Sequence, residues 1–79
     1  MVAEIKPDYT LDTKGMLCPQ PVLKTKVEID KLKSGQILEI LATDPAADPD
    51  LRAWAKRTGN IHLGTEVEGE VTKIYVKKK

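Results

Sequence analysis

The chain has 79 residues, of which 13 are Lys or Arg, 12 are Asp or Glu and 41% are hydrophobic. A chain this short is expected to form one small domain that buries about 60% of its unfolded surface, and its near-neutral charge argues against a dedicated nucleic-acid binder. One cysteine and one histidine exclude a disulfide and a structural zinc site. No apolar run approaches the roughly 20 residues that span a bilayer.

The first half of the chain predicts a strand, a helix and a second strand. Residues 1–6 lack periodicity and resemble no signal peptide, so we expect a loose end and, with the thiol kept free, a cytoplasmic location. Residues 8–12 alternate and predict a short strand. Residues 19–32 predict a helix that begins at its prolines. Residues 36–43 form a nearly continuous apolar run, which favours a central strand.

The second half predicts a helix and two more strands. Asp48 is a plausible N-cap and Pro49 a first helical residue, and Gly59 ends that helix. Residues 61–67 alternate as a strand, and a tight connection leads to a last strand at 71–76. Trp54 is interpreted as a core residue, His62 as a strand residue facing solvent, and residues 77–79 as a solvated tail.

The order β-α-β-α-β-β predicts an α+β fold. We expect a two-layer α/β sandwich in which right-handed crossovers place both helices on one face of a four-stranded mixed sheet. The order of the strands in the sheet is left open. Residues 1–79 are assigned to a single domain, with residues 1–6 and 77–79 loose.

Cys18 is the candidate reactive group. A helix N-terminus lowers the pKa of a thiol, but Pro19 and Pro21 lack N–H groups, so we expect moderate activation and good access. Gly15 lets the preceding loop turn sharply. His62 is far along the chain, which argues against a Cys-His hydrolase, and Pro21 stands where a Cys-x-x-Cys enzyme has its second cysteine. One thiol alone can accept a group, such as a persulfide sulfur, and pass it on.

Residues 12–21, DTKGMLCPQP, resemble the Asp-x-x-Gly-x-x-Cys-Pro-x-Pro signature of the TusA/SirA-like sulfur-carrier family, and the resemblance extends over most of the chain. It implies a carrier with sulfurtransferase character, rather than a complete catalyst, that needs no metal or organic cofactor. Cys18 would receive sulfur from a cysteine desulfurase or a rhodanese-like donor and relay it to an acceptor protein, in tRNA thiolation, molybdenum cofactor synthesis or sulfur oxidation. The residues expected to shape the site are Asp12, Gly15, Pro19, Gln20 and Pro21.

Other interpretations stay open. Cys18 could be a buried structural cysteine, an oxidant-sensing or selenium-handling thiol, or an incidental thiol in a non-catalytic interaction or regulatory module. Asp12 could serve only as a loop cap. Lys14, Lys24 and Lys26 concentrate positive charge near the thiol and are candidates for docking an acidic partner. Neither direct nucleic-acid binding nor a membrane is expected.

Overall fold

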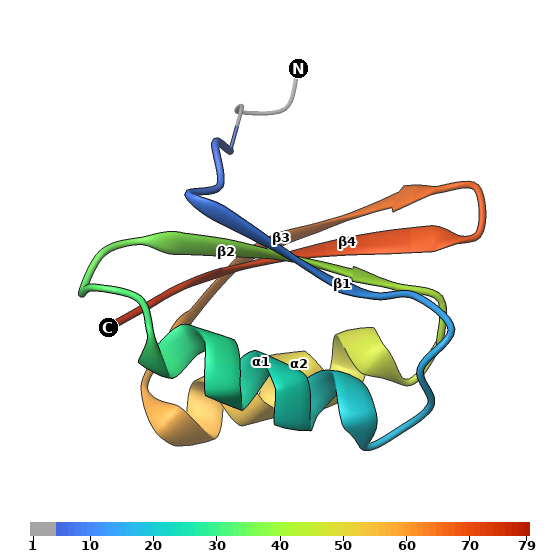
Figure 1. Cartoon of the computed structure of the whole chain (residues 1–79), viewed down its shortest axis with the longest axis horizontal. Helices are drawn as coiled ribbons and strands as arrows, with labels where there is room; N and C mark the ends of the chain where they lie inside the picture. The colour runs from blue at the N-terminus through green and yellow to red at the C-terminus, as the bar shows by residue number, and fades with distance from the viewer. Residues whose placement is uncertain (1–4) are drawn as a thin grey trace.

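The computed structural model describes residues 5–79, so most of the segment expected to be loose at the N-terminus lies outside the described residues. Two helices cover one face of a four-stranded sheet and lie below it in Figure 1, which confirms the predicted α+β fold and two-layer arrangement. Within the described residues, neither helix is long and apolar enough to cross a membrane. The elements, in chain order, are β1 (Tyr9–Thr13), α1 (Gln20–Asp30), β2 (Ile37–Ala42), α2 (Ala47–Thr58), β3 (Ile61–Glu68) and β4 (Val71–Lys77).

The sheet is mixed, with the strand order β1-β2-β4-β3. β1 and β2 pair in parallel, while β4 lies between β2 and β3 and is antiparallel to both. β2 is therefore a central strand, as its apolar run predicts. Because β1 and β2 are parallel neighbours, the loops that follow them both start at the carboxyl ends of the strands. Open α/β sheets commonly have their binding sites at these ends.

The core lies between the sheet and the helices. Alternate residues of β2, such as Ile40, and of β4, such as Ile74, are buried against the helices. Leu51 and Trp54 of α2 and Ile29 of α1 fill the other side of this layer, so the assignment of Trp54 to the core is confirmed. Burial of this aliphatic layer supplies the main driving force for folding.

Several predicted boundaries differ from the structure, among them those of α1, which spans Gln20–Asp30 rather than residues 19–32. Two further differences have identifiable causes. α2 begins at Ala47 rather than after Asp48, because the Asp44 carboxylate accepts the Ala46 N–H at 3.0 Å and starts the turn earlier. The C-terminal residues are not a solvated tail: Lys77 belongs to β4, and Lys78 donates its backbone N–H to the Gln36 carbonyl at 2.8 Å and its ammonium to the Leu32 carbonyl at 2.8 Å. The predicted end of α2 is confirmed by Gly59, whose φ of 82° is left-handed.

Candidate functional site

Cys18 lies in the loop between β1 and α1, and its side chain is exposed. The loop leaves β1 through a turn at Gly15, whose φ of 83° falls in the left-handed region that glycine adopts without a steric penalty. The Gly15 N–H then donates to the Thr43 hydroxyl at 2.9 Å, in the loop that follows β2. This hydrogen bond joins the two loops at the carboxyl ends of β1 and β2 and fixes the path of the chain toward the thiol.

Two carboxylates hold Cys18. Its backbone N–H donates to Asp44 Oδ2 at 2.8 Å, and its Sγ donates to Asp50 Oδ2 at 3.1 Å. Asp44 comes from the loop after β2, and Asp50 lies in the first turn of α2. The thiol therefore lies between the start of α1, in its own segment, and the start of α2, which supplies its hydrogen-bond acceptor.

These carboxylates set the electrostatics of the thiol. The hydrogen bond to Asp50, followed by partial desolvation and by the negative charges of Asp50 and Asp44, raises the pKa of Cys18 above its ordinary value. The expectation of a thiol activated by the helix N-terminus is therefore wrong in sign. The dipole of α1 favours a thiolate, whereas the Asp50 carboxylate that is hydrogen-bonded to the sulfur favours the protonated thiol.

The predicted site-shaping residues have distinct roles. Pro21 is buried, and its carbonyl accepts the Thr25 hydroxyl at 2.7 Å, which anchors the first turn of α1. Pro19 and Gln20 are exposed beside the thiol. Asp12 acts as the loop cap that the alternative interpretation describes, because its carboxylate accepts the Lys14 N–H at 2.9 Å.

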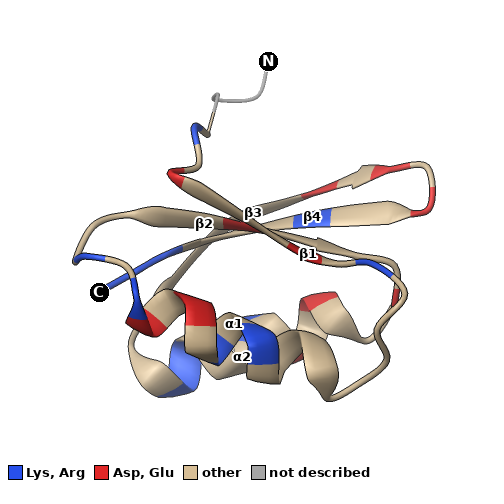
Figure 2. Ribbon diagram, in the orientation of Figure 1, with Lys and Arg blue, Asp and Glu red and all other residues tan. Residues whose placement is uncertain are grey.

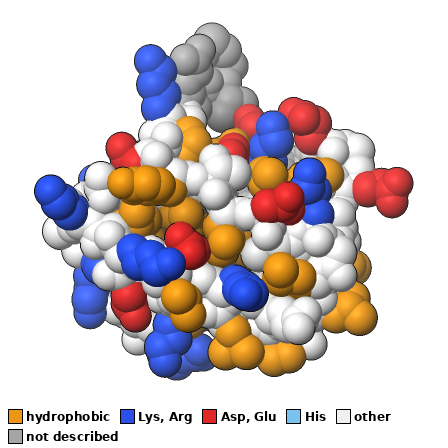
Figure 3. Space-filling model, viewed as in Figure 1, with side chains coloured by type: hydrophobic (Ala, Val, Ile, Leu, Met, Phe, Trp, Pro, Cys, Tyr) orange, Lys and Arg blue, Asp and Glu red, His pale blue; other side chains and the backbone are white. Residues whose placement is uncertain are grey.

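The lysines near the site are exposed, and α1 carries basic residues in its middle and acidic ones toward its C-terminal end (Figure 2). Lys24 lines a shallow groove together with Gln20, Leu23 and Val27. Leu23 is 56% exposed and Val27 is 55% exposed, although both are apolar. Hydrophobic and basic side chains are interspersed on the side of the molecule where α1 lies (Figure 3).

Sequence reasoning missed Asp44 and Asp50 as neighbours of the thiol. It treated Asp44 as a loop residue and Asp50 as a side chain that favours a helix start. The hydrogen bonds to Cys18 span 26 residues for Asp44 and 32 residues for Asp50. Parallel pairing of β1 with β2 would have been the signal, because it brings the two loops together.

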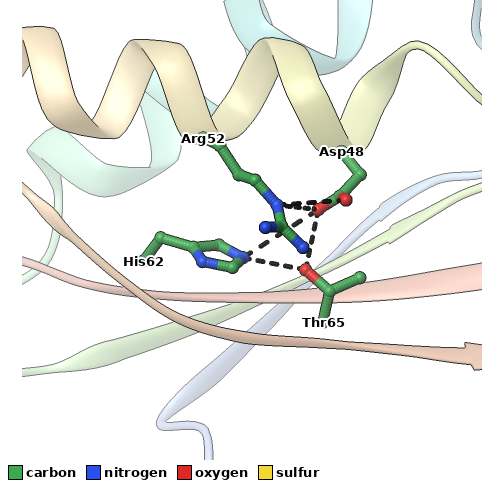
Figure 4. Close-up of polar contacts among 4 residues, drawn as sticks. All are labelled: Asp48, Arg52, His62 and Thr65. Carbon is green, nitrogen blue, oxygen red and sulfur yellow. Dashed lines mark hydrogen bonds and ion pairs between the residues drawn. The ribbon is translucent and has the colours of Figure 1, made fainter.

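His62 was expected to face solvent, and this is wrong. Its side chain points toward α2 and approaches Thr65 Oγ1 at 2.8 Å through Nε2 (Figure 4). Thr65 donates to Asp48 Oδ1 at 2.7 Å, and Arg52 Nε lies 3.1 Å from both oxygens of Asp48. Burial alone raises the pKa of Asp48, but the hydrogen bonds from Thr65 and Arg52 outweigh it and hold the pKa below its usual value. This cluster ties the start of α2 to β3.

Over residues 5–79, no three His, Cys, Asp or Glu side chains gather closely enough to hold an ion. His62 bonds within its own cluster and makes no hydrogen bond to Cys18 among the described residues. What the fold presents is a single exposed thiol in front of a helix, on a small two-layer α+β domain.

The sequence model of the family described as "Sulfurtransferase TusA" matches residues 9–78. The protein named "Putative sulfur carrier protein YrkI" of Bacillus subtilis is 45% identical over 74 residues, covering 94% of this chain and 99% of that protein. The "Sulfur carrier protein TusA" of Allochromatium vinosum is 39% identical over 71 residues, covering 90% and 93%. The chain therefore belongs to the TusA sulfurtransferase family.

Two further comparisons concern length and fold. YrkF of Bacillus subtilis is 49% identical over 94% of this chain, but the chain spans only 40% of that protein. The crystal structure of a SirA-like protein from Desulfitobacterium hafniense superposes with a TM-score of 0.78, covering 87% of this chain and 95% of the other at 23% identity. This likeness confirms the fold.

Proposed function

We propose that this protein is a sulfur carrier that accepts sulfur as a persulfide on Cys18 and relays it to an acceptor protein. The observation that carries the proposal is the exposed Cys18 thiol, the only thiol in the chain, in front of α1. A carrier needs one accessible sulfur that can be loaded and unloaded, and a second cysteine nearby would divert it into a disulfide. The family membership and the names of the relatives support the same role.

The proposed loading step needs no external oxidant. The Cys18 thiolate attacks the terminal sulfur of a donor persulfide, R–S–SH. A bond forms between Cys18 Sγ and that sulfur, while the donor's S–S bond breaks and its electron pair leaves on R–S⁻, which takes up a proton. In the unloading step an acceptor thiolate attacks the terminal sulfur, and Cys18 Sγ leaves.

The partners that we propose are a cysteine desulfurase or a rhodanese-like protein as donor, and a sulfur-accepting protein downstream. tRNA thiolation, molybdenum cofactor synthesis and cytoplasmic sulfur oxidation all fit a carrier of this kind. Gln20 stands where members that serve tRNA thiolation often have Glu, so it does not favour that pathway over the other two.

We further propose that Lys14, Lys24 and Lys26 help to dock an acidic partner. All three side chains are exposed, and Lys24 borders the apolar groove on α1. Charge reversal of Lys24 and Lys26 to Glu should slow sulfur transfer at low salt. The same double reversal at Lys56 and Arg57, two exposed basic residues in the last turn of α2, is the matched control and should change the rate much less. Equal rates in both variants would remove Lys24 and Lys26 from the docking surface.

The direct test of the carrier function is intact mass spectrometry. The protein is incubated without reductant with a cysteine desulfurase, pyridoxal phosphate and cysteine, and separately with inorganic polysulfide. We expect the mass of one added sulfur atom, removable by dithiothreitol and missing in Cys18→Ser. Since Cys18 is exposed, the variant should melt at the wild-type temperature. Sulfur that persists on Cys18→Ser, or no sulfur from either source on a wild-type protein that iodoacetamide still alkylates, would refute the proposal.

A further inference from the structure

The two carboxylates that contact Cys18 form no ion pair with a basic side chain in residues 5–79. Asp12, Glu28, Asp48 and Glu68 each lie within 4.0 Å of a basic side chain in the described part of the chain. No such ion pair is formed there by Asp44 or Asp50. Each instead accepts a hydrogen bond from Cys18, Asp44 from the backbone N–H and Asp50 from the thiol. The reacting sulfur is therefore next to two carboxylates that form no ion pair within 4.0 Å in residues 5–79.

We propose that Asp50, with Asp44 beside it, makes Cys18 selective for reaction partners that bring a positive charge to the sulfur. This inference rests on the proposed function and adds a specificity-determining residue to it. In the free protein, Asp50 holds the proton on the sulfur and disfavours the thiolate. A docked donor or acceptor with a cationic group beside its own reacting sulfur pairs with Asp50, and this neutralises the charge that opposes the thiolate.

The same contact restrains both directions of transfer. Loading needs the Cys18 thiolate as the attacking group, and a carboxylate at 3.1 Å reduces the fraction of thiolate. Unloading needs Cys18 Sγ to leave with the electron pair of the S–S bond, and a more basic thiol leaves more slowly. Small neutral or anionic thiols would therefore remove the carried sulfur slowly, whereas a partner protein that supplies the cation would receive it.

The test uses the exchange of Cys18 with two small disulfides, and it does not depend on sulfur carriage. Cystamine carries a positive charge on each half, and bis(2-hydroxyethyl) disulfide is neutral. In each reaction the Cys18 thiolate attacks one sulfur, a mixed disulfide forms, and the other half leaves as a thiolate. Rate constants are measured at neutral pH for the wild type, Asp50→Asn and the control Asp30→Asn. Asp30 is an exposed aspartate at the opposite end of α1 from Cys18.

The ratio of the rate constant for cystamine to that for the neutral disulfide should be roughly threefold larger in the wild type than in Asp50→Asn. This is the factor expected for the attraction between two unit charges about 6 Å apart in water. Asp50→Asn should also react several-fold faster with the neutral disulfide, and its pH profile should move to lower pH. Asp30→Asn should behave as the wild type. In about 1 M NaCl, where the Debye length is about 3 Å, the wild-type preference for cystamine should shrink. That salt dependence tests the idea without any substitution, in case Asp50→Asn melts early.

An equal preference for cystamine in the wild type and Asp50→Asn would overturn the selectivity, even if Cys18 carries sulfur. A salt-independent preference in the wild type would also overturn it. Loss of preference in Asp50→Asn on a protein that never takes up sulfur would leave the charge effect established and would refute the carrier function instead. The two failures are therefore distinguishable.

Discussion

The hydroxyl of Thr65 should contribute a measurable part of the free energy of unfolding of this protein. It donates to Asp48 Oδ1 at 2.7 Å and lies 2.8 Å from His62 Nε2, so it connects α2 to β3 (Figure 4). Thr65→Val keeps the β-branched shape and removes only the polar group. Among the described residues, the substitution leaves Arg52 as the remaining side-chain hydrogen-bond partner of Asp48. It removes the hydrogen bond of His62 Nε2, which is then left 3.9 Å from Asp48 Oδ1.

The expected cost follows from the exposure of the partners. A hydrogen bond to a charged group contributes about 1.5–3 kcal/mol when it is well buried. The Asp48 side chain is 25% exposed and that of His62 is 20% exposed, so water replaces part of the lost bonding. We therefore expect Thr65→Val to lower the free energy of unfolding by about 1–2 kcal/mol. A domain of 79 residues has roughly 4–12 kcal/mol in total.

Urea denaturation followed by circular dichroism measures this difference. With an m-value of about 1 kcal/mol/M, the midpoint should fall by about 1–2 M. Thr65→Ser is the matched control, because it keeps the hydroxyl and should stay within about 0.5 kcal/mol of the wild type. If Thr65→Val matches Thr65→Ser within about 0.3 kcal/mol, the cluster contributes nothing beyond packing and the reasoning fails.

Three further predictions concern the core and the titrating groups. Leu51→Ala should cost about 2–5 kcal/mol in thermal or urea unfolding, because the side chain is fully buried between the helices and the sheet. Burial and the charge of Arg52 outweigh Asp48 and lower the pKa of His62 below 6.5. Just below pH 6.5 the unfolded chain therefore binds more protons than the folded protein, so the free energy of unfolding should fall as the pH drops below that value. The urea midpoint should fall less over the same pH range in His62→Gln. Burial and the hydrogen bond to Glu39 raise the pKa of Tyr75 to about 12, so an ultraviolet absorbance titration should show a tyrosine step there that Tyr75→Phe lacks.

Much of the fold could be predicted from the sequence, because its signals are local. Alternation predicts the strands, helical spacing predicts the helices, and Gly59 predicts the end of α2. The strand order could not be read this way, since the insertion of β4 between β2 and β3 depends on pairing across the whole chain. The fate of Lys78 depends on the same pairing, because its partners Gln36 and Leu32 lie more than 40 residues earlier.

The candidate site also has a part that the sequence predicts and a part that it does not. Cys18, the glycine turn before it and the prolines after it lie within a few residues of one another, so the sequence predicts an accessible thiol before a helix. The charge at that thiol comes from Asp44 and Asp50, which belong to another segment. The residues next to Cys18 in the sequence indicate only the dipole of α1. The sequence therefore predicted a lowered pKa for Cys18, whereas the structure gives a raised one.

The reactivity of this thiol is therefore a property of two segments and not of the Cys-Pro motif alone. Pro19 and Pro21 remove two of the N–H groups with which the start of α1 could stabilise a thiolate. The nearest strong influence on the sulfur is then the carboxylate of Asp50, in contact at 3.1 Å. A relative that keeps the motif but lacks an acidic residue at the position of Asp50 should have the same accessible thiol with a lower pKa. Relatives should accordingly be compared by the segment around the cysteine and the start of α2 together, because these two segments meet at the sulfur.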